Sequence, residues 1–194
     1  MSDRFQVLQA IIQQRHTTKP ARMNGEKIDD KVIEQLLQLA DFAPTHARTE
    51  PWRFMVYRGV ALEEFCEAHA DLYWAHTDVE IRSQEKYEKI KHQYKKVSHL
   101  IISIMKRTEG ARIPAEEEYA AVCAAVEHIL LGCEALGLAA IWSTGGMTHK
   151  PAFRSFLNLR EQDSVIALIF IGKSDESFSP VPRKIPMEEK IKWI

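Results

Sequence analysis

Residues 15–20 read Arg-His-Thr-Thr-Lys-Pro and directly follow an apolar helical pattern. Arginine can bind a phosphate through two parallel hydrogen bonds, threonine hydroxyls add neutral donors, and Lys19 adds a point charge. Pro20 prevents the helix from continuing. Two interpretations are therefore open: an anion-binding cradle, or an ordinary solvated helix end whose cations complement the helix dipole. Taken alone, the six residues favour the solvated helix end.

Three further segments carry polar groups beside apolar elements. They are Thr45 and His46 in a loop ahead of a strand, Ser143, Thr144 and Gly145 in a glycine-rich turn, and Arg183 and Lys184 in the C-terminal tail. Two basic clusters would repel each other if they came together without an anion between them, and a phosphate would remove that cost. The sequence has neither a Gly-rich dinucleotide fingerprint nor a Walker-type loop, so side chains would have to bind the anion.

Other chemistries find less support in the sequence. Ser143 is not in a Gly-x-Ser-x-Gly nucleophile elbow. The eight histidines show no pairing at metal-ligand spacing on one helix face, so we predict no metal site. No pair of carboxylates can be assigned to acid–base work. A chain with an anion cradle but no nucleophile, base or metal indicates that a bound cofactor carries the chemistry.

The length and composition of the chain indicate what class of protein carries these residues. The chain has 194 residues, of which 45% are hydrophobic and 27% charged, and a net charge of −1. We expect one domain over residues 1–194, with no general attraction to nucleic acid or to acidic membranes. No apolar run reaches the ~20 residues of a membrane span. The odd number of widely spaced cysteines predicts buried free thiols in a cytoplasmic protein.

Hydrophobic periodicity predicts a mixed succession of helices and strands. We expect helices over residues 3–15, 30–43, 62–96, 115–136 and 150–157, and strands over residues 52–57, 97–105, 138–142 and 163–171. The run 97–105 is almost unbroken in its apolar character, which is typical of a strand buried on both faces. Five lysines lie between residues 84 and 96, and we interpret them as a solvated helix face. From Gly172 onward the chain reads as an extended tail.

At this point the chain resembles the FMN-dependent nitroreductase family over nearly its whole length. Residues 15–19 match that family's Arg-x-Ser/Thr-x-Lys/Arg segment, and residues 43–54 match Ala-Pro-Ser-x-x-x-x-Gln-Pro-Trp-x-Phe. Residues 135–142 match Ala-Leu-Gly-Leu-Gly-x-x-Trp, and residues 182–189 match Pro-Arg-Lys-Pro-Leu-Glu-Glu. Each motif is modest alone, but four in the right order are specific.

The resemblance implies an α+β (mixed α/β) fold with a central mixed sheet flanked by helices. It further implies a homodimer in which the C-terminal tail is exchanged with the partner subunit, and FMN in each of two clefts at the interface. NADH or NADPH would reduce the FMN. A ping-pong mechanism would then deliver hydride to a nitroaromatic, a quinone or a related small acceptor.

The resemblance also implies roles for individual residues. Arg15, His16, Thr17, Arg183 and Lys184 would hold the phosphate end of FMN. Lys19 would stabilise the reduced, anionic ring, with no catalytic side chain besides. The remaining contacts to the ring would come from Trp142, Ser143, Thr144 and Gly145, and from Thr45 and His46 reaching the FMN of the other subunit.

Three positions depart from the family pattern. Arg48 stands where many members have an asparagine, Glu50 replaces a glutamine, and His16 stands where many carry a second arginine. Two alternatives therefore stay open beside the oxidoreductase. One is a specialised flavoenzyme of the same fold, for dehalogenation, enoyl reduction or flavin cleavage. The other is a flavin-binding protein without catalysis.

Overall fold

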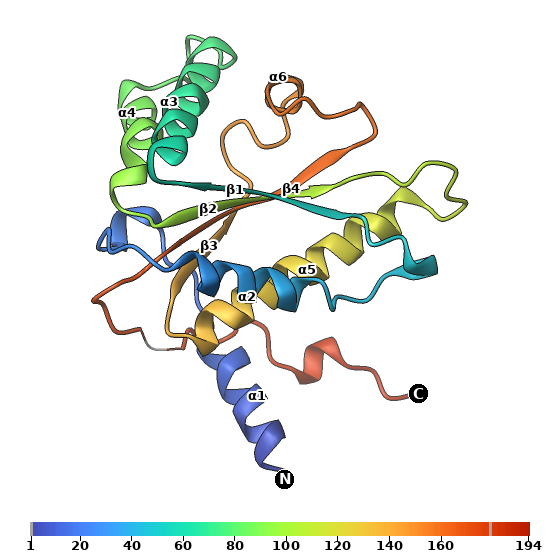
Figure 1. The fold of residues 1–194 in the computed structure, drawn as a ribbon. Coiled ribbons are helices and arrows are strands. Elements are labelled where there is room, and N and C mark those ends of the chain that lie inside the picture. The colour runs from blue at the N-terminus through green and yellow to red at the C-terminus, as the bar shows by residue number, and fades with distance from the viewer. Residues whose placement is uncertain (1, 179) are drawn as a thin grey trace.

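A four-stranded sheet forms the centre of the computed structural model, which describes residues 2–178 and 180–194 (Figure 1). The sheet has the order β1-β2-β4-β3. Its strands are β1 Trp52–Arg58, β2 His99–Met105, β3 Ala139–Ser143 and β4 Ser164–Gly172. Each begins and ends within two residues of its predicted position, so the predicted strands are confirmed.

Every strand pair in the sheet is antiparallel, so the expected mixed sheet is wrong. The mixed sheet was expected from the family resemblance. Instead, the helical segment after β1 returns the chain to the end of the sheet that it left, because Arg58 pairs with His99 at the start of β2. The α+β class and the helices on both faces are as expected.

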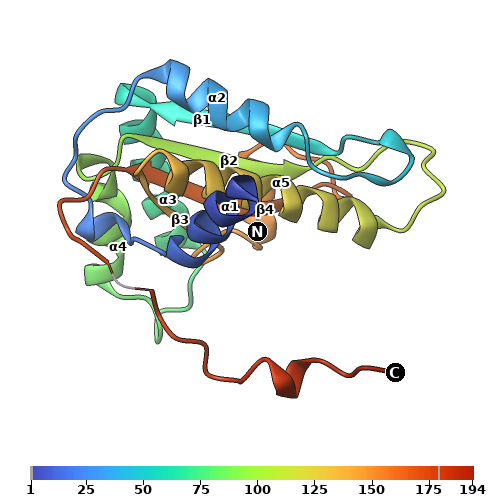
Figure 2. The same cartoon turned by 90° about the horizontal axis from the view of Figure 1, so that it is seen from below.

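Helices cover both faces of the sheet (Figures 1 and 2). On one face lie α2 (Asp30–Ala40) and α5 (Ala115–Ala135), and on the other lie α3 (Gly59–Ala75), α4 (Gln84–His92) and α6 (Pro151–Phe156). The side chains of β2 and β4 alternate between the two layers. Ile101 and Ile169 join the core under α5, whereas Leu100 and Leu168 join the core under α3. Both strands are therefore buried on both faces, as the run 97–105 predicted.

The layer under α5 is closely packed. Asp29 caps α2 by accepting a hydrogen bond from the Lys31 amide at 2.9 Å. Gly137, at φ +64°, ends α5 one turn after Cys133. A Cβ on Gly132 would lie 2.6 Å from a Leu36 methyl, so any larger residue there would force the Leu36 side chain to shift.

The prediction of one helix over residues 62–96 is wrong, because the segment forms two helices with a break between them. α3 ends at Ala75, and α4 begins only at Gln84, where Ser83 caps it by accepting from the Lys86 amide at 3.1 Å. The Ser83 amide donates to the Tyr73 hydroxyl at 2.9 Å, which ties the cap to the preceding helix. Residues 76–83 contain neither glycine nor proline, so the sequence carries no strong breaker here.

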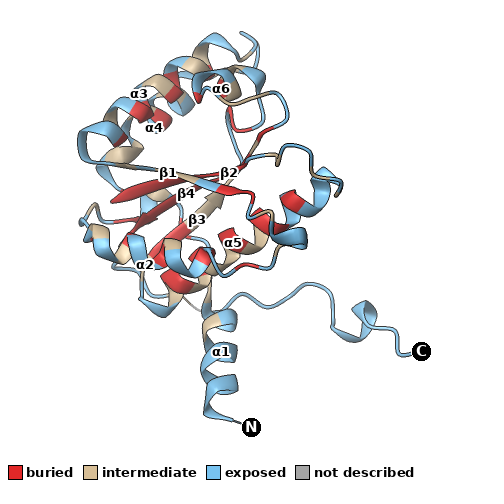
Figure 3. Ribbon diagram, turned by 45° about the vertical axis from the view of Figure 1, so that its right-hand side comes forward, coloured by how far each residue is buried: buried red, intermediate tan, exposed pale blue. Residues whose placement is uncertain are grey.

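The two ends of the chain stand apart from these layers (Figure 3). α1 (Asp3–Gln14) has no buried residue, and its apolar side chains Phe5, Leu8 and Ile12 are about half exposed. Residues 180–194 are exposed throughout. Among the described residues, no helix has the length and apolar character needed to cross a membrane.

The three cysteines are free thiols. Cys66 and Cys133 are buried, while Cys123 is half-buried. Burial raises the pKa of Cys66 to about 11 and that of Cys133 to about 12, so both are protonated at neutral pH. They act as small core side chains rather than as nucleophiles.

Candidate functional site

The segment after α1 passes the C-terminal half of α5. Arg15 Nε lies 3.7 Å from a carboxylate oxygen of Glu127, and His16 Nδ1 lies 3.6 Å from one of Glu134. The His16 ring also packs against Phe178, with ring centroids 4.1 Å apart. Arg15 and His16 are thus held loosely by α5 and remain partly accessible.

Thr18 fixes this segment to the sheet. Its amide donates to the Ala140 carbonyl at 2.9 Å, so residues 17–19 run along the free edge of β3. Thr18 is fully buried, and its hydroxyl has no hydrogen-bond partner within the described residues. Thr17 and Lys19, on either side of it, are exposed. This alternation turns both side chains outward from the edge strand.

The turn after β3 lies on the same edge strand. Trp142 is anchored by its indole N–H, which donates to the Ile166 carbonyl at 3.1 Å. The Gly145 carbonyl accepts from the Thr148 hydroxyl at 2.8 Å, and Gly146 adopts φ +66°. The exposed amides of residues 144–146 donate no hydrogen bond to any part of the chain that the structure describes. The turn therefore offers a row of free donors.

Thr45 and His46 lie at the other end of α5. His46 pairs with Glu117 in the first turn of that helix, and Thr45 Oγ1 is 3.1 Å from Thr49 Oγ1. Glu117 and Glu134 are ~25 Å apart along the helix axis, at about 1.5 Å per residue. Glu127, beside Arg15, is ~15 Å from Glu117 on the same scale. Within one chain, Thr45 and His46 therefore meet neither Arg15 nor His16.

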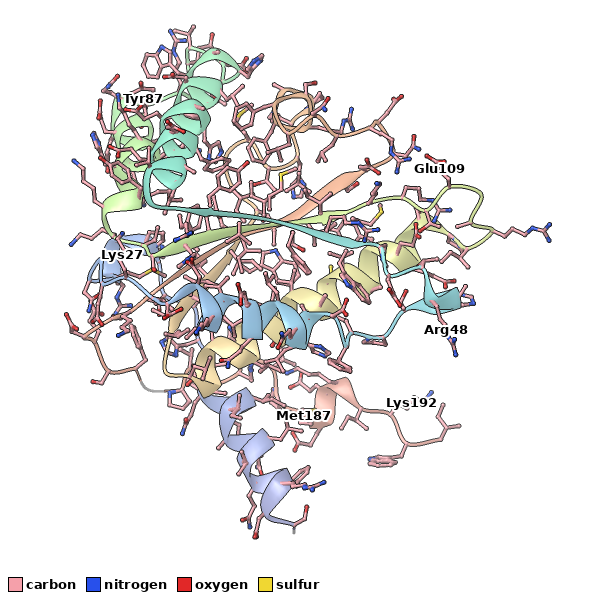
Figure 4. The ribbon with its side chains drawn as sticks, in the orientation of Figure 1. Lys27, Arg48, Tyr87, Glu109, Met187 and Lys192 are labelled. Atoms are coloured by element: carbon pink, nitrogen blue, oxygen red, sulfur yellow. The ribbon has the colours of Figure 1, made fainter. Side chains whose placement is uncertain are left out.

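The loop that carries Thr45 has an unusual backbone. Ala47, Arg48 and Glu50 all have positive φ, between 43° and 53°, a conformation that L-residues adopt at some cost. The Arg48 side chain points away from the sheet at the tip of this loop (Figure 4). His46 and Arg48 are exposed and Thr45 is partly exposed, so all three are accessible from outside the chain.

Arg183 and Lys184 are exposed and form no ion pair or side-chain hydrogen bond with the described residues. The tail is held at its base, where Asn24 donates to Asp175 at 2.9 Å, Arg22 pairs with Glu176, and Phe178 packs against His16. Beyond that base it extends away from the body, with Met187 and Lys192 on the far portion (Figure 4). One chain alone does not close the predicted cradle.

The turn 143–146 borders a cavity of about 240 Å³ that the sequence did not indicate. Its other walls come from α3, α4 and β4, and they include His69, Lys86, Lys89 and Gln93. Lys86 and Lys89 are exposed, as expected for a solvated helix face, and they also line this cavity. The spacing of residues 86, 89, 90 and 93 fits a single helical face, which is the signal that could have revealed it.

His69 is the buried polar group of this cavity. It is 4% exposed, and neither ring nitrogen has a hydrogen-bond partner in the described chain. Burial, with a smaller contribution from nearby Lys86, lowers the pKa of His69 to about 4, so the ring is neutral at pH 7. Its Nε2 lies close to Gly146, where an added Cβ would be 3.5 Å away.

Several known proteins are similar to this chain in sequence or in fold. A Bacillus subtilis protein, provisionally named NAD(P)H nitroreductase YfhC, is 22% identical over 184 residues, covering 95% of this chain and 92% of that protein. A nitroreductase-like family protein from Bacillus cereus shares the fold with a TM-score of 0.83 and 22% identity, covering 96% of this chain and 95% of that one.

A provisionally assigned nitroreductase from Desulfovibrio desulfuricans, solved in complex with FMN, matches with a TM-score of 0.68 and 26% identity. That alignment covers 95% of this chain and 94% of the other. The family model described as "Nitroreductase family" matches residues 12–173, which is most of the chain. The chain therefore belongs to the nitroreductase family.

Proposed function

We propose that this protein is an FMN-dependent NAD(P)H oxidoreductase that acts as a homodimer on nitroaromatic, quinone or related small acceptors. The hydrogen bond from the Thr18 amide to Ala140 carries the proposal, because it places the basic segment on the strand that leads into the donor turn. Ala140 and Ser143 are separated by ~10 Å along β3, at about 3.3 Å per residue. Membership of the nitroreductase family supports the same activity.

The residues present fit a cofactor that has a phosphate at one end and a flat polar ring at the other. Arg15 and Thr17 would bind the phosphate, with His16 beside them, and the buried, unpartnered Thr18 hydroxyl lies between the two exposed side chains. The free amides of the turn 143–146 would donate to the ring. Lys19, exposed near the β3 edge, would favour the reduced ring as a fixed cation.

FMN, when bound, would supply the chemistry for hydride transfer between NADH or NADPH and the acceptor, in ping-pong order at a shared site. The chain's own residues bind, orient and charge-stabilise the cofactor. Trp142, locked by its bond to the Ile166 carbonyl, would hold the turn rigid under the ring. No protein side chain needs to act as a nucleophile.

A second copy of the chain would complete the site. Thr45 and His46 lie ~15 Å along α5 from Arg15 and ~25 Å from His16, at about 1.5 Å per residue, so they would serve the FMN bound mainly by the partner. Arg183 follows Phe178 by five residues, a span of at most ~18 Å, so it can reach the phosphate beside His16. The exposed apolar side chains of α1 and the tail, including Trp193 at 91%, give the partner a surface to bury.

The absorption spectrum of the purified protein tests this proposal. We expect a yellow protein that releases FMN rather than FAD on denaturation, and that oxidises NADH or NADPH steadily when a quinone is present. A colourless protein that does not bind added FMN contradicts the cofactor assignment. A yellow protein that does not turn over with a quinone or a nitroaromatic is a flavin-binding protein, which contradicts the catalytic part alone.

A further inference from the structure

The helix α4 presents two lysines to the cavity beside the turn 143–146. Lys86 and Lys89 lie one turn apart on the face of α4 that borders this cavity, and Gln93 follows one turn later. Tyr87 of the same helix packs against Trp74 of α3, with ring centroids 5.7 Å apart. Tyr87 donates to Asp71 at 2.9 Å, which ties α4 to α3.

No counter-ion accompanies these two ammonium groups. Neither Lys86 nor Lys89 forms an ion pair within the described residues, and no aspartate or glutamate lines the cavity. The acidic neighbour Glu88 is occupied elsewhere, by Gln84 and His92. The Lys86 ammonium lies over the Tyr73 ring, 4.7 Å from the ring centroid, and this contact does not neutralise its charge. An anion placed between Lys86 and Lys89 would reduce the repulsion between the two charges.

The remaining walls are apolar or neutral. Leu168 and Phe170 of β4 form the floor, and His69 contributes a neutral imidazole with two unpartnered nitrogens. A neutral imidazole can donate one hydrogen bond and accept another. At about 240 Å³ the cavity is smaller than a typical drug-sized site, so it suits one small ring with a substituent.

We propose that this cavity selects an electron acceptor made of a small flat ring bearing a negatively charged group such as a carboxylate. Lys86 and Lys89 bind the charge, and the ring lies over the apolar floor next to the turn 143–146. This proposal rests on the proposed function, which places the flavin at that turn. The phosphate of a coenzyme has the same anionic chemistry, and the test distinguishes the two sources.

The test uses two acceptors that share one ring, 4-nitrobenzoate and the neutral 4-nitrobenzamide. For the FMN-loaded wild-type protein we expect the higher kcat/KM with the carboxylate, through a lower KM. In the Lys86→Gln/Lys89→Gln double variant, the ratio of the two kcat/KM values should fall about 10- to 100-fold. Lys86→Arg/Lys89→Arg should restore most of it, because the charge returns.

Lys91→Gln is the matched control. It removes the same charge from the same helix, but Lys91 pairs with Glu67 at 3.5 Å and does not line the cavity. We expect it to leave the ratio of the two acceptors unchanged. An equal fall of the ratio in Lys91→Gln would show a general charge effect and overturn the proposal.

A binding measurement separates this proposal from the proposed function. Isothermal titration of 4-nitrobenzoate into the oxidised, FMN-loaded protein needs no turnover. Binding that is lost in the double variant supports the cavity even where neither acceptor is reduced. A rise in the Kd for FMN or in the KM for NADPH, with the acceptor ratio unchanged, assigns the lysines to a coenzyme and overturns the proposal. So does a wild-type protein that binds both compounds equally.

Discussion

Two basic segments of this molecule, α4 and the C-terminal tail, differ in how they are held. α4 buries Ile90 in the core between α3 and the sheet, is capped by Ser83 and is tied to α3 through Tyr87. Residues 180–194 carry Arg183 and Lys184 but bury nothing in their own chain. One buried side chain, a cap and the hydrogen bond of Tyr87 thus hold the lysines of α4 beside a cavity.

The contrast teaches that the number of charges in a segment does not locate a binding site. The lysines of α4 are held in place because neighbouring residues of the helix pack against the core. The cations of the tail make no such contacts within one chain. A second copy of the chain, which we propose, would supply the contacts that the tail lacks. Five changes break or sharpen this comparison.

Removal of residues 181–194 should have the largest effect. Because this segment is exposed and contacts nothing in its own body, the secondary structure should survive. The dimer, whose interface we expect to exceed ~2,000 Å², should be lost together with tight FMN binding. Sedimentation velocity, circular dichroism and FMN titration measure the three properties. A truncated protein that stays dimeric and yellow would show that the tail contributes nothing.

Arg15→Ala should come next, since it removes a charge-assisted contact to the cofactor phosphate. We expect FMN affinity to fall by about 10- to 150-fold, with activity recovered at excess FMN. Lys19→Ala is its counterpart: it should lower the flavin midpoint potential and slow reduction by NAD(P)H even at saturating FMN. If Arg15→Ala stays inactive at saturating FMN and Lys19→Ala changes neither potential nor rate, the two placements are wrong.

Ile90→Ala should loosen the anchored segment. The side chain is 9% exposed and packs in the core under α3 and α4, so its truncation should lower the free energy of unfolding by about 2 kcal/mol. Urea denaturation measures this. Ile81→Ala is the control, because Ile81 is 72% exposed in the break between the two helices and should change stability by less than ~0.5 kcal/mol. Equal effects in both variants would contradict the anchoring role of Ile90.

Ser83→Ala should have the smallest effect, about 1 kcal/mol of unfolding free energy, because it removes the cap of α4. Hydrogen exchange should locate the loss in the first turn of that helix. Ser2→Ala provides the comparison, since Ser2 occupies the N-cap of α1 without a side-chain capping bond. We expect no measurable change there, and an equal loss would show that the Ser83 bond is not the cause.

Local patterns in the sequence determined much of this protein. The unbroken apolar run 97–105 predicted a strand buried on both faces, and Asp29 and Gly137 marked a helix start and a helix end. These features depend on contacts within a few residues along the chain, which periodicity and capping report directly. The four motifs likewise indicated the family that the comparisons confirm.

Tertiary structure alone decided the rest. Nothing local distinguishes an antiparallel sheet from a mixed one, because that depends on where the α3–α4 segment returns the chain, with Arg58 beside His99. The break at residues 76–83 depends on the bond between Ser83 and Tyr73, and the role of the α4 lysines depends on which face Ile90 buries. The length of α5 separates Thr45 from Arg15 within one chain. Contacts between residues far apart in sequence fix each of these features, and local periodicity does not report such contacts.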